Sequence, residues 1–243
     1  MKNSNRGWMI FAALLIATGL ALSVSACKKE KEPEPAPILD PDKPATPSPA
    51  RAEVDESRLR YVIQVTDPGQ GQMRMEYSFD KPRMNMKMTM NEGAGWQVMT
   101  HIISDGKAVF MVNEADRSVM KMPLNQDMID QMVPDQLMST LVYDEFVREL
   151  GVGTPKKTGT DTVGGTKVTK YEIQEPDGEG LMWLSVDNKG LVRKVEVRDG
   201  GVGAEISTME VIELDLNPKF SAKEFEPPAG YTVNDLSGMM EQP

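Results

Sequence analysis

The chain has 243 residues, of which 27 are Lys or Arg and 37 are Asp or Glu, so its formal net charge is −10 at pH 7. This acidic balance argues against binding nucleic acid or anionic lipid headgroups through a basic patch. A single histidine and a single cysteine exclude an internal disulfide and leave few of the ligands that a catalytic zinc site normally uses.

The first 26 residues have the three-part build of a secretory signal peptide. Lys2 and Arg6 give a basic start, an apolar run follows over residues 8–24, and small residues stand directly before Cys27. This arrangement resembles the bacterial lipobox, and the resemblance implies cleavage before Cys27 and acylation of its thiol. The alternative is an uncleaved membrane anchor, because the apolar run is close to the length of a short membrane span.

Residues 27–53 predict a lipid-anchored, proline-rich tether. Seven prolines and almost no apolar side chains leave this segment unable to bury a core. Lys28 stands where the sorting rule of enteric bacteria places the aspartate that retains a lipoprotein in the inner membrane. We therefore expect a lipid anchor in the outer membrane of a Gram-negative cell envelope, with the protein facing the periplasm.

From residue 54 the pattern changes to short alternating segments separated by turn residues, which is typical of an antiparallel sheet. The first three segments, 59–65, 73–79 and 84–90, each have one apolar and one polar face. Such a sheet has one face in water and one face covered.

Further strands are expected at 107–113, 117–122, 166–174, 181–186, 191–198 and 204–214, and one more around His101, for a total of about nine to eleven. Residues 151–165 are interpreted as a polar loop. Residues 125–150 have apolar side chains at helical spacing and predict one or two amphipathic helices, divided at Pro134. These helices must bury their apolar stripe against the sheet.

The sequence contains no recognisable catalytic constellation. His101 is the only histidine, no serine stands in a G-x-S-x-G turn, and neither a phosphate-binding glycine loop nor a dinucleotide fingerprint is present. His101 is therefore interpreted as an ordinary sheet residue. We expect a protein that is not an enzyme and that uses no cofactor.

The stretch PRMNMKMTMN, residues 82–91, has methionine at every second position, which allows three interpretations. Thioethers are soft ligands that suit Cu(I), so the first is a copper site. The second is an ordinary core in which methionine is the filler. The third is a cavity for an apolar ligand, since methionine suits surfaces that adapt to varied apolar partners. The residues expected to line that cavity are Tyr61, Ile63, Met73, Met75, Tyr77, Met84, Met86, Met88 and Met90.

Two C-terminal segments resemble the LolA/LolB-like superfamily of lipoprotein carriers and receptors. They are LMWLSVDNKGLVRKVEVRDG at 181–200 and MEVIELDLNPKFSAKEFEPPAGY at 209–231, where Phe225, Pro228, Gly230 and Tyr231 match the closing element of that family. The resemblance implies an α+β fold, an open half-barrel of curved antiparallel sheet whose concave face is lidded by helices. In characterised members the hollow between them holds acyl chains.

The combined prediction is a half-barrel domain at 54–236 followed by a disordered tail at 237–243. It would act as a monomer, attach to the membrane through Cys27, and bind or sense a lipid or lipoprotein through its acyl chains. The alternative function is a structural or protein-interaction lipoprotein with a filled core. Cu(I) handling ranks third, because the methionines adjoin aromatic and aliphatic stripes on the same face.

Overall fold

The computed structural model describes residues 57–91, 93–125, 141–150, 154–174, 180–199 and 204–237. The predicted signal peptide, Cys27 and the predicted tether therefore lie outside the described residues, as does nearly all of the predicted C-terminal tail. Within the part of the chain that is described, no helix has the length and apolar character needed to span a membrane.

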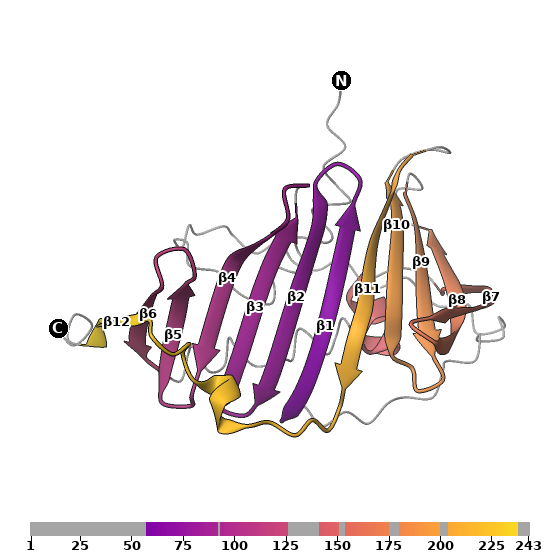
Figure 1. The fold of residues 1–243 in the computed structure, drawn as a ribbon. Helices are drawn as coiled ribbons and strands as arrows, with labels where there is room; N and C mark the ends of the chain where they lie inside the picture. The colour runs from indigo at the N-terminus through magenta and orange to yellow at the C-terminus, as the bar shows by residue number, and fades with distance from the viewer. Residues whose placement is uncertain are drawn as a thin grey trace, which may run out of the picture.

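Twelve strands form one sheet in the order β12-β6-β5-β4-β3-β2-β1-β11-β10-β9-β8-β7 (Figure 1). All neighbours are antiparallel except β12 and β6, which are parallel. The strands are β1 (Arg58–Asp67), β2 (Gly71–Asp80), β3 (Arg83–Asn91), β4 (Trp96–Ser104), β5 (Ala108–Asn113), β6 (Ser118–Pro123), β7 (Lys156–Val163), β8 (Thr166–Gln174), β9 (Gly180–Asp187), β10 (Val192–Asp199), β11 (Ile206–Asp215) and β12 (Thr232–Asp235).

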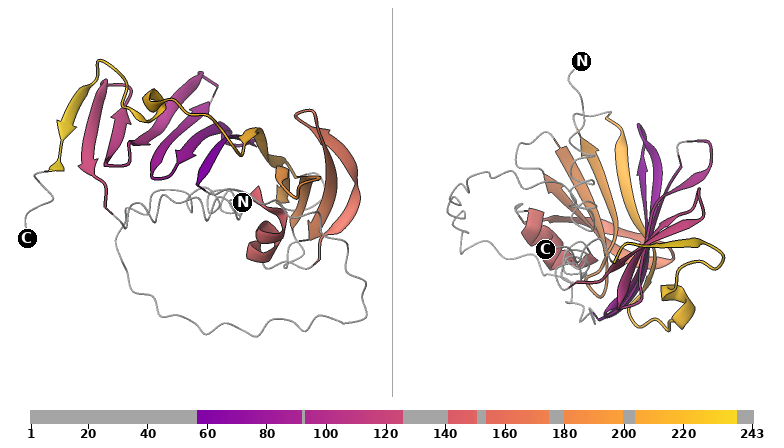
Figure 2. Two further views of the ribbon diagram at one scale, coloured as in Figure 1. Left: turned by 90° about the horizontal axis from the view of Figure 1, so that it is seen from below. Right: turned by 90° about the vertical axis from the view of Figure 1, so that its left-hand side faces the viewer.

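Strand β1 joins the two halves of the sheet, because it pairs with β2 on one side and with β11 on the other. The meander β1–β6 therefore continues across β1 into the meander β7–β11. The outermost strands β12 and β7 do not pair with each other, so the curved sheet stays open (Figure 2). This confirms the predicted α+β half-barrel.

Two strands were not expected from the sequence. Residues 156–163, interpreted as part of a polar loop, form the edge strand β7 and pair with β8. Seven of the eight β7 residues are exposed, so the strand has no apolar face to reveal it. Strand β12 has only four residues, and all of them are exposed. These two edge strands bring the total to twelve, one above the expected range.

One helix is described on the concave side of the sheet, which we call the inner face (Figure 2). It is α4, Tyr143–Leu150, with acidic residues in its first turn and a basic residue in its last turn, as the helix dipole favours. The Tyr143 amide donates a hydrogen bond to the Gly190 carbonyl at 2.9 Å, and its ring lies 4.8 Å from that of Tyr171. Phe146 is 1% exposed. The expected lid is thus confirmed for 141–150, whereas the earlier helix lies outside the described residues.

The C-terminal segment crosses the opposite, outer face of the sheet (Figure 1). After β11 the chain passes through a short 3-10 helix, η1 (Ala222–Phe225), and then adds β12 beside β6. Phe225 is 1% exposed, with its ring 4.6 Å from the Arg83 guanidinium carbon. We call residues 216–231 the strap, because they tie the end of β11 to the far edge of the sheet.

The buried side chains form two groups. The larger lies on the inner face and combines apolar residues of β1, β2, β3 and β8–β11 with residues 141–146. The smaller lies on the outer face of β4, β5 and β6, where Tyr231 of the strap packs against it. Both faces of the β4–β6 region are therefore partly apolar, as the apolar residues at both parities of 107–113 indicated.

Candidate functional site

The methionine strand β3 presents its thioethers to the inner face, opposite the apolar side chains of β2. Directly opposed residues of an antiparallel pair share a face. The register pairs Met84 with Phe79, Met86 with Tyr77, Met88 with Met75 and Met90 with Met73. The first two methionines therefore face aromatic rings, and the last two face other methionines.

We call Met73, Met75, Met88 and Met90 the methionine quartet. Its members form two adjacent cross-strand pairs at the ends of β2 and β3 that join β2 to β1 and β3 to β4. Met73 and Met75 are 8% and 4% exposed, whereas Met88 and Met90 are half-buried. The quartet therefore lies where the buried core gives way to a more accessible surface.

The same face continues across the sheet with falling burial. One row of directly paired residues runs Tyr61, Tyr77, Met86, Ile102, Met111 and Met120 from β1 to β6. Its first three members are no more than 6% exposed, Ile102 and Met111 are half-buried, and Met120 is 43% exposed. We call the half-buried and exposed part of this face the methionine surface: Met88, Met90, Ile102, Met111 and Met120.

All nine residues expected to line a cavity lie on this inner face. Seven of them are buried below 9% exposure, and the two accessible ones are Met88 and Met90. That they line an open cavity stays a prediction. Met111 and Met120 were not predicted to lie on this face, because their strands, β5 and β6, do not alternate regularly between apolar and polar residues. Only the pairing register places them there.

His101 lies on the outer face, away from the methionine surface. It is 8% exposed, and its Nδ1 lies 2.9 Å from Glu114 Oε1. Burial lowers the pKa of His101, and the hydrogen bond with Glu114 opposes this shift. The Tyr231 hydroxyl donates to the same carboxylate and, together with His101, holds the pKa of Glu114 below its usual value. His101 is thus a sheet residue that links β4 to the strap through Glu114.

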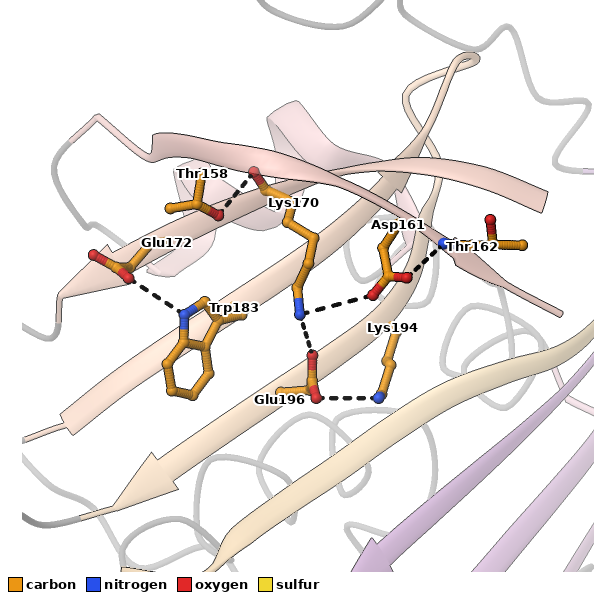
Figure 3. Close-up of polar contacts among 8 residues, drawn as sticks. All are labelled: Thr158, Asp161, Thr162, Lys170, Glu172, Trp183, Lys194 and Glu196. Atoms are coloured by element: carbon orange, nitrogen blue, oxygen red, sulfur yellow. Dashed lines mark hydrogen bonds and ion pairs between the residues drawn. The ribbon is translucent and has the colours of Figure 1, made fainter. Parts of the chain in front are cut away.

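A second polar group covers the outer face of β7–β10 (Figure 3). The Lys170 ammonium lies 3.1 Å from Glu196 Oε2, and the Lys194 ammonium lies 3.1 Å from the other oxygen of the same carboxylate. Burial acts to raise the pKa of Glu196, but the two lysines outweigh it and lower the pKa. The Trp183 indole N–H donates to Glu172 at 3.3 Å. These paired charges balance one another and form an ordered polar surface.

The acidic and basic side chains do not assemble a metal centre in the described ranges. No group of three or more His, Cys, Asp or Glu residues within them is placed to hold a metal ion.

Comparison with known proteins gives one family. A family model described as "Domain of unknown function (DUF4412)" matches residues 60–191, which is more than half of the chain and runs from β1 to the start of β10. A search of the curated proteins found no match.

Solved structures with a similar arrangement are remote in sequence. The MucA/MucB complex of Pseudomonas aeruginosa matches 73% of this chain at 11% identity and a TM-score of 0.39, and this chain spans 58% of that one. An uncharacterised conserved protein of Thermus thermophilus matches 74% of this chain and 91% of its own at 8% identity and a TM-score of 0.38. A LolA superfamily protein of Nitrosomonas europaea matches 72% of this chain and 92% of its own at 12% identity and a TM-score of 0.25. At these values the similarity conveys nothing about ligand or partner.

Proposed function

The chain belongs to the family described as "Domain of unknown function (DUF4412)", whose description assigns no activity, and we propose its function from its own residues. We propose that it is an envelope lipoprotein, anchored through Cys27, that binds an acyl-chain-bearing ligand on the methionine surface. In this proposal it binds or senses the ligand without catalysing a reaction.

The observation that supports the proposal is the continuity of the apolar inner face beyond its buried part. The row from Tyr61 to Met120 stays apolar over six strands while exposure rises from 1% to 43%. A contiguous apolar surface of this kind commonly marks a binding site. Methionine is unbranched and polarizable, so such a surface adapts to flexible chains of varied length.

The energy available is sufficient for specific binding. Burial of a methylene group stabilises a complex by about 0.8 kcal/mol, so ten buried methylenes contribute about 8 kcal/mol before the costs of association. An acyl chain carries no charge that would have to be paired on the apolar inner face. A long tether, about 75 Å when extended as polyproline II, would let the domain reach ligands away from its anchoring membrane.

The second candidate is a structural or protein-interaction lipoprotein with a filled core. It is favoured by the strong burial of Tyr61, Ile63 and the other five residues of the expected lining that are below 9% exposed. The two functions differ in what the half-buried methionines contact. In the first they contact ligand, and in the second they contact only the protein.

The test compares two lysine substitutions in neighbouring strands, β6 and the edge strand β12. Met120 is 43% exposed on the inner face of β6, and Val233 is 50% exposed on the outer face of β12, where it pairs with Val119. Residues 28–243 would be exported to the periplasm and titrated with a fluorescent fatty acid, and native mass spectra would report co-purified lipid.

We expect the unsubstituted domain and its Val233→Lys form to bind the probe, and Met120→Lys to bind about tenfold more weakly or worse, a change of about 1.4 kcal/mol. Lysine places a charge beside the acyl chain in Met120→Lys alone. A clean apo mass with no probe uptake by the unsubstituted domain would contradict the proposal and favour the filled core.

A further inference from the structure

We infer a second binding capacity on the inner face: the methionine quartet is a thioether site for a soft monovalent metal ion, Cu(I) or Ag(I). The inference does not depend on acyl-chain binding. It rests on the pairing register, which brings together four sulfur donors that the sequence distributes over two strands.

The register places the four side chains within reach of one ion. Met73 faces Met90 and Met75 faces Met88, so the Cβ atoms within each pair are about 5 Å apart. The two pairs follow each other at a spacing of two residues, about 6.6 Å along the strand. The four Cβ atoms mark the corners of this small rectangle, and each thioether sulfur lies only two bonds beyond its Cβ. A change of χ1 and χ2 rotamers can therefore turn the four sulfurs toward the centre.

The quartet is distinct from the other two methionines of β3. Met84 and Met86 face Phe79 and Tyr77, so neither has a thioether directly opposite. They are also 3% and 6% exposed, whereas Met88 and Met90 are half-buried and leave a route for an ion. The proposed Cu(I) site therefore involves only Met88 and Met90 of β3 and not all four methionines of that strand.

A β-bulge adjoins the quartet. The β3–β4 register shifts between Met88 and Thr89, where Thr100 and Val98 are the paired residues and Met99 of β4 has no opposite residue. Bulges increase the local twist of a strand and redirect side chains, and they occur often beside functional sites. Met99 itself is 57% exposed.

Thioether chemistry selects the ion. Soft sulfur ligands prefer Cu(I), whereas Zn²⁺ and Cu²⁺ are better served by imidazole, thiolate or oxygen donors, which the quartet lacks. Thioethers need no deprotonation, so binding should be nearly independent of pH, unlike binding to Cys or His. Neutral donors compensate none of the ion's charge. A divalent ion would bring two uncompensated charges to this apolar face instead of one, so divalent ions are disfavoured further.

The experiment uses the full-length protein purified in detergent micelles. Cu(I), kept reduced by ascorbate, is titrated in competition with a chromophoric Cu(I) chelator. The test variant is Met88→Leu/Met90→Leu, and the matched control is Met84→Leu/Met86→Leu, which removes the same number of thioethers from the same face of the same strand. Leucine conserves apolar volume, so both variants should fold, which a thermal melt checks.

We expect one Cu(I) per chain for the unsubstituted protein and the control, and at least about tenfold weaker binding by the test variant. The Cu(I) affinity should change little between pH 5.5 and pH 7.5, and Zn²⁺ should not compete. Absence of Cu(I) binding by the unsubstituted protein, or equal loss in both variants, would overturn the inference. Fatty acid titration of the unsubstituted protein in the same preparation reports acyl-chain binding separately, so either binding capacity can fail while the other stands.

Discussion

His101 is the only titratable side chain of β4, and its environment makes folding stability depend on pH. Burial lowers its pKa below the ordinary value of 6.5, and Glu114, Lys87 and Glu76 are the charged groups that act on it. The unfolded chain therefore binds the proton more readily than the folded protein. The contribution to stability is complete above the unfolded pKa and is lost as the pH falls through about 6.5 toward the folded pKa.

Replacement by glutamine should remove this pH dependence. We expect the urea concentration at the unfolding midpoint of the unsubstituted protein to decrease as the pH is lowered from 7.5 to 5.5. The midpoint of His101→Gln should change less. Glu114 stays ionised across this window because its own pKa is lowered. The chain has no other histidine, so an equal slope in both proteins would contradict the assignment.

At the scale of elements, the strap holds to the outer face mainly through Phe225. Its ring is 1% exposed, lies 5.2 Å from the Phe220 ring and is covered by the Arg83 guanidinium. Asn85 of β3 donates a hydrogen bond to the Glu224 carbonyl at 2.7 Å, and Arg60 of β1 forms an ion pair with the Glu224 carboxylate. The strap is therefore fixed by one buried ring and a rim of polar contacts.

Truncation of that ring should destabilise the domain more than any rim change. We expect Phe225→Ala to lower the free energy of unfolding by about 3–5 kcal/mol, because a fully buried aromatic ring is lost and a cavity remains. Lys223→Ala, an exposed position in the same short helix, should change it by less than about 0.5 kcal/mol. Chemical denaturation measures both. Equal effects would show that the strap does not depend on the ring.

The sequence predicted the strands that bury apolar side chains and missed the two edge strands that are almost entirely exposed. β1, β2 and β3 were found because each has an apolar inner face, and the Asn188-Gly190 turn was found from its residues. β7 was missed because an exposed edge strand buries only Val163. α4 was found from its helical spacing, and Phe146 and Leu141 are buried as that spacing requires.

The candidate site was predicted in part for the same reason. Alternation alone placed the four methionines of β3 on one face. The opposing pairs depend on the register between β2 and β3, which the two-residue Lys81-Pro82 loop sets and which side-chain alternation alone does not give. The extension to Met111 and Met120 depends on the pairing of β4 with β5 and of β5 with β6. Composition therefore indicated an apolar face, and only the fold shows how far it extends.

At the scale of the whole molecule, the sheet stays open, with β12 and β7 as its two edge strands. The pairing of β1 with β11 makes this arrangement possible, because it joins segments about 150 residues apart and allows the strap to return across the outer face. The strap therefore lies on the outer face. The methionine surface, where we propose that ligands bind, lies on the opposite face of the same sheet.

The proposed lipid anchor would decide where the protein operates, and Cys27 provides the test. We expect the unsubstituted protein in the membrane fraction, with an N-terminal peptide beginning at an acylated Cys27, since several acyl chains make an anchor stable. Cys27→Ser cannot be acylated at that position. If the lipobox interpretation holds, this variant lacks the lipid-modified N-terminus and its maturation by cleavage before residue 27 is blocked, so it accumulates as a longer precursor.

With an uncleaved membrane anchor, the apolar run would hold both proteins in the membrane and both would keep residues 1–26. Their masses would then differ only by the replacement of Cys with Ser. Intact-mass measurement of the purified chains separates the two cases.

Lys28→Asp provides the control for location. It retains the acylated cysteine and should keep the membrane attachment. Where the enteric sorting rule applies, it should move the protein from the outer to the inner membrane in a density gradient. Attachment through lipid and delivery to the outer membrane are thereby tested by different residues, so either can fail while the other stands.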